Sequence, residues 1–419
     1  MIGTISKDKI FQILFVLCIS VPYFNNYELT FVIWLFTVIY TLQRKYSVNF
    51  LTQIFCFSAI LAIAFCSSLF SNFKAYNFIR DITYFLKPIF GLLIGYQICK
   101  TRIKEPLKLV VNTGVIIALL HIAIIIYCFL ILNVRDINSL RYYAGYFSDY
   151  EVYVLVFLFF SKELKIDISK SKRRNFIIIL AISSLFYLSR TNFIQFVILF
   201  LAFKGFFTMN RRNITILTTI IVVISLGYST ILFINPKRNG PGLEAFLYKI
   251  KIAPTEPFKT KINREDYKDF NDNYRSVENI LTFNQMTSEE NGTIIFGKGL
   301  GSLVNLHTEV ILDDTLLKEI SILHNGFMTV FLKSGILGIL ILIYSITSLY
   351  RNCYFSDNKF KNSNYIFVGT IVFLFFSYWV FMGLYFKADT KSILIGLLIA
   401  YVERMKKRQL NNEALKITQ

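Results

Sequence analysis

Charged residues are scarce in this chain: Asp, Glu, Lys and Arg make up 17% of its 419 residues, while 55% are hydrophobic. Soluble proteins carry about 25% charged residues, so this composition excludes an ordinary soluble domain. The hydrophobic residues also lack the spacing of amphipathic stripes. They fall in blocks of roughly 15–25 residues, the length that crosses about 30 Å of hydrocarbon. The sequence therefore predicts an all-α polytopic membrane protein.

Acidic residues are the scarcer charge, with 26 Asp and Glu against 45 Lys and Arg. Such an excess of positive charge can favour nucleic acid. The basic residues do not, however, form one stripe between exposed aromatic residues. They are concentrated in alternate short segments between apolar blocks, as the positive-inside rule predicts. We therefore expect membrane lipids as a partner and no nucleic acid.

Cysteine is sparse as well. No Cys-x-x-Cys pair occurs, and none of the six cysteines lies in the largest polar segment. This arrangement indicates neither a disulfide framework nor a zinc site. The first apolar block begins near Phe11 without a convincing small-residue cleavage site, and further blocks follow at once. We expect a retained first helix and not a signal peptide.

The apolar blocks predict about twelve transmembrane helices. Their approximate ranges are 10–24, 28–43, 50–70, 82–99, 108–133, 147–161, 175–189, 191–207, 213–234, 323–350, 364–386 and 389–403. Two divisions depend on short breaks, at 189–191 and at 382–391, where one tilted helix would also fit. With twelve helices, the basic clusters and both termini fall on the cytoplasmic side.

One long polar segment interrupts this pattern. The predicted division is nine membrane helices over 1–234, a large external loop over 235–322, three membrane helices over 323–403 and a basic cytoplasmic tail over 404–419. Long loops cross the membrane whatever their charge, so the basic residues of the loop do not contradict an outer location. Connections this long usually carry function or are disordered. The second half of this one is expected to be partly structured.

Several features on the predicted outer side could carry chemistry. Arg190 lies in Tyr187-Leu-Ser-Arg-Thr191 between two apolar blocks, where a buried cation is costly unless it faces a cavity or an anion. Arg275 belongs to the large loop, which also contains Phe296-Gly-Lys-Gly-Leu-Gly301. The glycines allow a tight turn and close backbone approach. His324 opens a later apolar block, where an imidazole could transfer a proton or hydrogen-bond a phosphate.

Each feature by itself has a plainer interpretation. Arg190 could extend to the outer lipid headgroups, Arg275 could be solvated, and His324 could be an ordinary interfacial residue. The glycine turn lacks the surrounding strand–helix unit of a dinucleotide site. Asp149 and Glu151, at the outer end of another block, are alternative bases.

The order of these features resembles the O-antigen polymerase and O-antigen ligase family of bacterial envelope glycosyltransferases. An arginine between two helices is followed by an arginine in a large outer loop, the glycine turn, His324-Asn325 at the start of a helix, and Gly335-Ile-Leu-Gly338 within it. Residues 81–95 also look like an early helix of these proteins. The resemblance covers the topology and especially residues 185–345. It departs from the family at Lys333-Ser334, where an acidic residue often precedes the glycine.

The resemblance implies polymerisation of undecaprenyl-diphosphate-linked repeat units into O-antigen, capsule or exopolysaccharide, without a metal or cofactor. It implies that Arg190 and Arg275 contact the diphosphate and that His324 is essential, as a base or as a phosphate ligand. Guanidinium groups suit this role, because they stabilise charge that develops as the sugar C1–O bond breaks. A chain-length regulator and a flippase are the expected protein partners. Further predicted substrate contacts are Arg135, Arg141, Lys333, Gly299, Gly301 and Asn325.

Two other functions stay open. A ligase of the same family moves finished glycan to a lipid core. A flippase for lipid-linked oligosaccharides also has about twelve helices, but transporters often show two similar halves. No similarity between the halves is evident here, and apart from Lys87 and Lys333 the apolar blocks are nearly free of charge. The sequence favours the polymerase.

Overall fold

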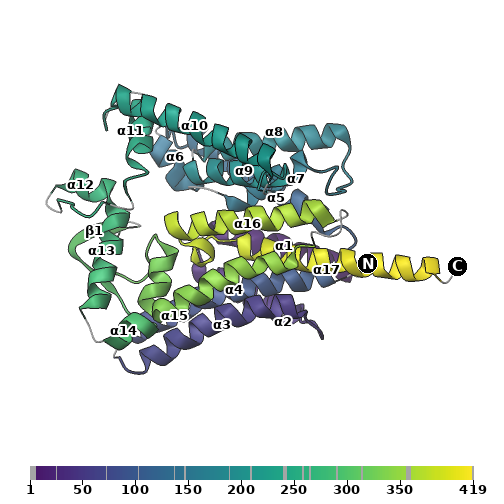
Figure 1. Cartoon of the computed structure of the whole chain (residues 1–419), viewed down its shortest axis with the longest axis horizontal. Coiled ribbons are helices and arrows are strands. Elements are labelled where there is room, and N and C mark those ends of the chain that lie inside the picture. Colours follow the sequence, from purple (N-terminus) through teal and green to yellow (C-terminus); the bar gives the residue numbers. More distant parts are fainter. Residues whose placement is uncertain are drawn as a thin grey trace.

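The structure of the protein, a computed structural model, describes residues 6–24, 26–71, 73–101, 103–135, 137–145, 148–187, 189–207, 210–238, 243–256, 259–263, 266–288, 291–312, 315–354 and 360–417. Helices dominate it (Figure 1). Every predicted apolar block coincides with a helix. These helices are α1 (Lys7–Ser20), α2 (Tyr27–Tyr40), α3 (Val48–Ser68), α4 (Ala75–Lys100), α5 (Pro106–Leu130), α7 (Asp149–Phe159), α8 (Lys170–Phe186), α9 (Arg190–Phe203), α10 (Arg211–Ile234), α15 (Gly326–Ser348), α16 (Lys361–Val380) and α17 (Lys391–Ile417).

Within the described residues, six helices are long and apolar enough to cross a membrane: α3, α4, α5, α10, α15 and α16. The apolar helices α2 and α9 have 14 residues each, so each extends about 21 Å, less than the hydrocarbon thickness. In the part of the chain that the structure describes, short 3₁₀ helices follow the ends of longer ones: η1 (Val21–Phe24), η3 (Leu349–Asn352) and η5 (Gly383–Tyr385). This is the architecture of an all-α membrane protein, and the number of twelve spans stays a prediction.

Both uncertain divisions are real breaks between helices. α8 ends at Phe186 and α9 begins at Arg190. Ser189 caps α9, because its hydroxyl accepts the backbone N–H of Asn192, which satisfies a donor that has no partner within the helix. The second break separates α16, which ends at Val380, from α17, which begins at Lys391.

Close contact between α4 and α17 forms the centre of the bundle. A Cβ added at Gly95 would lie 1.8 Å from the carbonyl oxygen of Ile393, and one at Gly396 would lie 2.1 Å from that of Leu92. Small residues at such contacts let two backbones approach closely, as is typical of helix pairs in membranes. Around this pair, α3 packs on α15 and α9 packs on α16. By contrast, α10 lies at the periphery, and none of its most apolar stretch is buried within the protein.

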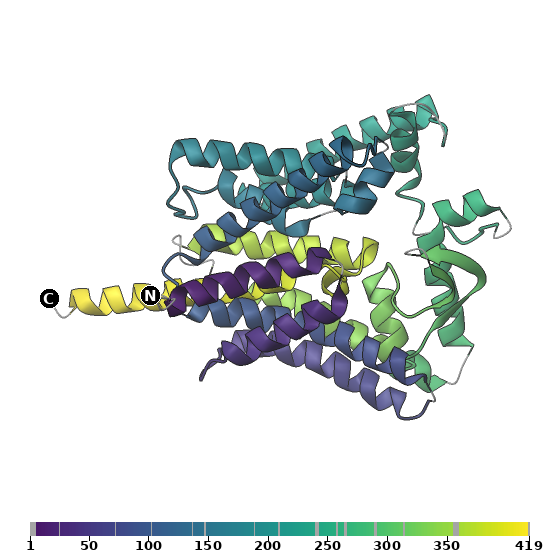
Figure 2. The same ribbon diagram turned by 180° about the vertical axis from the view of Figure 1, so that it is seen from behind.

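The large polar segment is folded. It contains α11 (Glu244–Ile252), α12 (Tyr267–Asp272), α13 (Tyr274–Thr287), α14 (Asn291–Phe296) and an antiparallel pair of strands, β1 (Val304–Leu312) and β2 (Thr315–Ile320). The strand pair is a small exception to the all-α prediction. The segment lies at the end of the bundle opposite the two termini (Figures 1 and 2). Its apolar core includes Val277, Leu281 and Leu306 and continues onto Phe331 and Leu332 of α15.

A buried ion pair attaches this segment to the bundle. Nζ of Lys333, in α15, lies 2.5 Å from Oδ2 of Asp81, in α4, and both side chains are fully buried. Asp81 also accepts the backbone N–H of Gly301 at 2.7 Å and the hydroxyl of Ser321 at 2.5 Å. Lys333 also donates to the carbonyl of Ser302. We call these five residues the anchor. It joins two helices of the bundle to the glycine turn and to the residue after β2.

The glycine turn fits between α3 and α15. The φ angles of Gly299 and Gly301 are +85° and +84°, in the region that favours glycine. A Cβ at Gly299 would lie 2.3 Å from the backbone nitrogen of Ser68. The N–H of Leu300 donates to the carbonyl of Ala64 at 3.1 Å, and the N–H of Gly299 donates to that of Lys333 at 3.1 Å. The turn therefore serves the packing of the segment on the bundle.

Removing one charge of the anchor is expected to destabilise the protein strongly. Lys333→Met leaves the buried Asp81 carboxylate with only the more distant Arg80, whose Nε lies 3.7 Å from Oδ1, and breaking a buried ion pair costs about 3–5 kcal/mol. Thermal unfolding of the purified protein in detergent measures the effect. The double variant Asp81→Leu with Lys333→Met leaves neither charge uncompensated, so we expect it to recover part of the loss.

Lys318→Met is the matched control, because the Lys318 side chain is 68% exposed and pairs with Glu309 at the surface. A surface pair contributes roughly 0–1 kcal/mol. Equal unfolding temperatures for Lys333→Met and Lys318→Met would contradict the role assigned to the anchor.

Candidate functional site

The three residues predicted to be catalytic belong to one electrostatic cluster. Arg190 is the first residue of α9, Arg275 lies in the first turn of α13, and His324 precedes α15. The charges of Glu256 and Arg275 act on both Arg190 and His324. Residues that are far apart in the sequence are thus brought within electrostatic range at the end of the bundle where the polar segment packs.

Glu256 is the acidic partner of the two arginines. Its carboxylate lies 3.5 Å from Nη1 of Arg275 and is 13% exposed. Arg190 contacts the same region, because its Nη1 donates to the carbonyl of Lys249 in α11 at 2.8 Å. A guanidinium group has five N–H donors, more than these contacts use. Both arginines are held in place and keep donors for an anion.

Glu278 fixes the position of His324. One carboxylate oxygen lies 2.9 Å from Nδ1 of the imidazole, and the other accepts the backbone N–H of His324 at 2.9 Å. Glu278 is 1% exposed and the His324 side chain is 26% exposed. The ring of Tyr274 meets the imidazole edge to face, with 5.6 Å between centroids. Because Nδ1 faces Glu278, Nε2 is the ring nitrogen that can meet a substrate.

The surroundings of His324 favour its protonated form. Burial lowers the pKa of the imidazole. The charge of Glu278 and its hydrogen bond together raise that pKa by more than burial lowers it, so the pKa lies above its usual 6.5. The positive charge of Arg275 opposes this rise. A protonated imidazole donates from both nitrogens and cannot accept a proton. A neutral imidazole that donates Nδ1–H to Glu278 has Nε2 as an acceptor, so this geometry suits either a hydrogen bond to phosphate or general-base catalysis.

Asn325 begins α15. Its Oδ1 accepts the N–H groups of Phe327 and Met328 at 3.0 and 3.2 Å, and the residue is 2% exposed. Since the cap sets where the helix begins, Asn325 also determines where the preceding His324 lies. Asn325, predicted to contact substrate, is thus a buried helix cap in this structure.

The other predicted contacts divide into two groups. Arg141 lies on α6 (Ile137–Ala144), and its charge acts on Arg190. Arg135 is an exposed residue shortly before that helix. Lys333, Gly299 and Gly301, in contrast, lie in or beside the buried anchor and present no open surface to a substrate in this conformation.

The sequence did not predict a set of buried polar contacts that includes Tyr187, three residues before Arg190. The Tyr187 hydroxyl donates to Glu151 at 2.9 Å, and the ring of His121 stacks on that of Tyr187 with 3.7 Å between centroids. Asp149 pairs with Lys391, which also lies 2.8 Å from Asp389. Both carboxylates considered as alternative bases are therefore buried and engaged. Tyr187 directly follows α8, so its contacts help to position the end of that helix before the break to α9.

Sequence reasoning missed Glu256 and Glu278. Glu278 follows Arg275 by three residues, a spacing that places two side chains on one face of a helix, so Tyr274-Arg-Ser-Val-Glu-Asn279 contained a signal for it. Glu256 has no such signal, because it reaches Arg275 only through the folding of the segment. The described part of the chain has no group of three or more His, Cys, Asp and Glu side chains that could hold a metal ion.

Comparison with protein-family models gives no match, and comparison with curated proteins gives no significant relative. The functional interpretation thus rests on the motifs and on the geometry of the site.

The pairing of His324 with Glu278 predicts a pH dependence. The folded-state pKa of His324 is raised, so the stabilisation is fully present below about pH 6.5 and is lost as the pH rises through the raised value. Glu278→Gln removes the carboxylate and leaves burial, so it lowers the pKa of His324. Histidine-selective NMR in detergent can measure this, because the chain has 3 histidines.

The substitution His307→Gln is a suitable control and helps assignment, because His307 is exposed on β1. It should leave the His324 titration unchanged. A His324 pKa that stays the same in Glu278→Gln would refute the assigned pairing.

Proposed function

We propose that this protein is a glycosyltransferase that polymerises oligosaccharide repeat units carried on undecaprenyl diphosphate. The observation that carries the proposal is the cluster of Arg190, Arg275 and a protonation-prone His324 at one end of the bundle. Fixed cationic donors of this kind are complementary to a diphosphate. The order of the motifs, which resembles that of O-antigen polymerases, supports the same substrate.

In the proposed reaction, the two arginines hold the diphosphate of the donor. The bond between the sugar C1 and the phosphate oxygen breaks, and a new bond forms between C1 and a hydroxyl of the acceptor glycan. The proton of that hydroxyl passes to the departing undecaprenyl diphosphate, directly or through water. Negative charge grows on the departing diphosphate, so fixed cations stabilise the transition state more than the ground state. His324 donates from Nε2 to a phosphate oxygen, and Glu278 holds it in that orientation.

Glu256 has a separate part in this proposal. Its carboxylate is the partner of Arg275 while no donor is bound. A diphosphate oxygen replaces Glu256 when the donor binds, so the arginine remains paired in both states and is held in position before the reaction. Such preorganisation reduces the cost of reorganising the site during the reaction.

We place the reaction at the outer face of a bacterial cytoplasmic membrane, with both termini in the cytoplasm. The support is the distribution of Lys and Arg, which gather around the helix ends on the side of the termini. A lipid-linked donor reaches an outer site only after transfer across the membrane. The proposed partners are therefore a flippase that delivers the donor and a chain-length regulator.

The glycan ladder of the source bacterium tests the function. A strain that lacks this protein should carry single repeat units on its acceptor, and the wild-type chain should restore long glycans. Arg190→Ala, Arg275→Ala and His324→Ala should each slow chain growth by about 100-fold, the loss expected when one donor to a developing charge is removed. Expression of the variants must be matched to that of the wild type.

Arg212→Ala is the control, since Arg212 is an exposed residue at the start of α10 and should leave the ladder unchanged. If the deletion strain carries no repeat units on the acceptor at all, a ligase or flippase becomes the better assignment. If the three site variants give normal ladders, the proposed site is wrong.

A further inference from the structure

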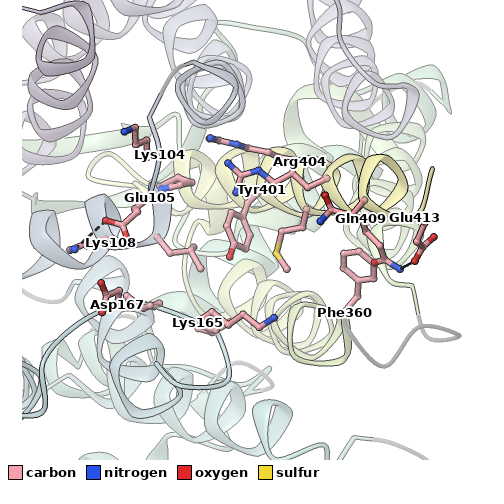
Figure 3. Close-up of a pocket in the computed structure, with 17 residues that line it drawn as sticks. Lys104, Glu105, Lys108, Lys165, Asp167, Phe360, Tyr401, Arg404, Gln409 and Glu413 are labelled. Atoms are coloured by element: carbon pink, nitrogen blue, oxygen red, sulfur yellow. Dashed lines mark hydrogen bonds and ion pairs between the residues drawn. The ribbon is translucent and has the colours of Figure 1, made fainter. Parts of the chain in front are cut away.

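The end of the bundle that holds the termini contains a pocket that the proposed transfer does not use. Its volume is about 740 Å³, and it lies between the start of α5, the connection from α7 to α8 and one face of α17 (Figure 3). α17 contributes Tyr401, Met405 and Arg408, which recur at intervals of three and four residues and so share one face of the helix.

Basic side chains outnumber acidic ones around this pocket. Two of the cations have partners within the protein: Arg404 donates to the carbonyl of Ile103 at 2.5 Å, and Lys108 pairs with Glu105 at 3.1 Å. Among the described residues, Lys104, Lys165 and Arg408 also line the pocket, and none of these three side chains forms an ion pair or hydrogen bond. The acidic residues that line it besides Glu105 are Asp167 and Glu413. Figure 3 shows Lys104 and Lys165 on opposite sides of the opening. The pocket thus offers unneutralised positive charge.

The same pocket has an apolar wall. Leu107, Leu164, Phe360 and Met405 line it together with the charged groups. Its volume falls in the range of about 300–1,000 Å³ that is usual for sites of small ligands. A suitable ligand is therefore amphiphilic, with an anionic group for the lysines and an apolar part for the wall.

We propose that this pocket binds the phosphate headgroup of an anionic phospholipid, with the start of an acyl chain along the apolar wall. The position supports a lipid, because α4 ends and α5 and α8 begin at this level, which is the depth of the headgroups whichever way the chain is inserted. Basic pockets between transmembrane helices recognise anionic lipid headgroups in this way. A soluble phosphate compound satisfies the cations but leaves the apolar wall uncovered.

Thermal unfolding of the purified full-length protein in detergent tests the proposal. Dioleoyl phosphatidylglycerol should raise the unfolding midpoint, whereas dioleoyl phosphatidylcholine and glycerol 3-phosphate at the same concentrations should not. The triple variant Lys104→Ala, Lys165→Ala and Arg408→Ala should bind phosphatidylglycerol about 100-fold more weakly, because each basic residue near anionic lipid contributes about fivefold and the three factors multiply.

The matched control is the triple variant Lys162→Ala, Lys170→Ala and Lys407→Ala, which removes the same charge from exposed positions near this end of the bundle. It should bind phosphatidylglycerol as the wild type does. Equal weakening in both triple variants would overturn the proposal in favour of diffuse surface attraction. An equal shift with glycerol 3-phosphate would overturn it in favour of a soluble phosphate.

The single variant Arg408→Ala protects the test against misfolding of the triple variant, because Arg408 is exposed near the end of the chain. Its affinity for phosphatidylglycerol should fall about fivefold. An unchanged affinity would show that the lipid binds elsewhere. The measurement needs no glycan, so its failure leaves the proposed transferase function untouched.

Discussion

The buried contact between Asp81 and Lys333 is the interaction on which the candidate site depends. Two charges can stay in the interior only if each compensates the other and neutral donors satisfy the remaining lone pairs. Here those donors come from the glycine turn and from Ser321, so the polar segment completes the surroundings of the ion pair. Lys333 lies on the helix that His324 precedes. The ion pair holds α15 in place, and Glu278 holds the imidazole that precedes this helix.

Charge balance also organises the surface of the site. Glu256 and Glu278 are acidic residues beside basic groups, and each has a different effect. Glu278 is buried and raises the proton affinity of His324, whereas Glu256 is partly exposed and compensates Arg275. In the proposed reaction, an anion that enters the site replaces the partly exposed carboxylate of Glu256 and leaves Glu278 in place. In this proposal, Glu256 balances the charge of Arg275 when no ligand is bound and gives way when an anionic ligand binds.

Much of this organisation could be predicted from the sequence, because apolar blocks and helix caps are local signals. The apolar blocks indicated the helices, and the order of Arg190, Arg275 and His324 indicated the cluster. Long-range pairing could not be predicted. Lys333 was expected to contact substrate, whereas the structure pairs it with Asp81. No local pattern could indicate that pairing, because Asp81 lies 252 positions away in the sequence. The fold of the polar segment was also hidden, since its helices are short and its core is completed by α15.

The exposed helix α10 has a consequence for the arginine cluster. Its most apolar stretch is not buried by the rest of the described protein, so a bilayer that covered it would influence its tilt through hydrophobic mismatch. The Tyr228 hydroxyl of α10 donates to the carbonyl of Lys251, and the carbonyl of Lys249 in the same short helix, α11, accepts from Arg190. Two hydrogen bonds separate the guanidinium of Arg190 from α10. A change in the tilt of α10 would therefore reach the arginine cluster through α11.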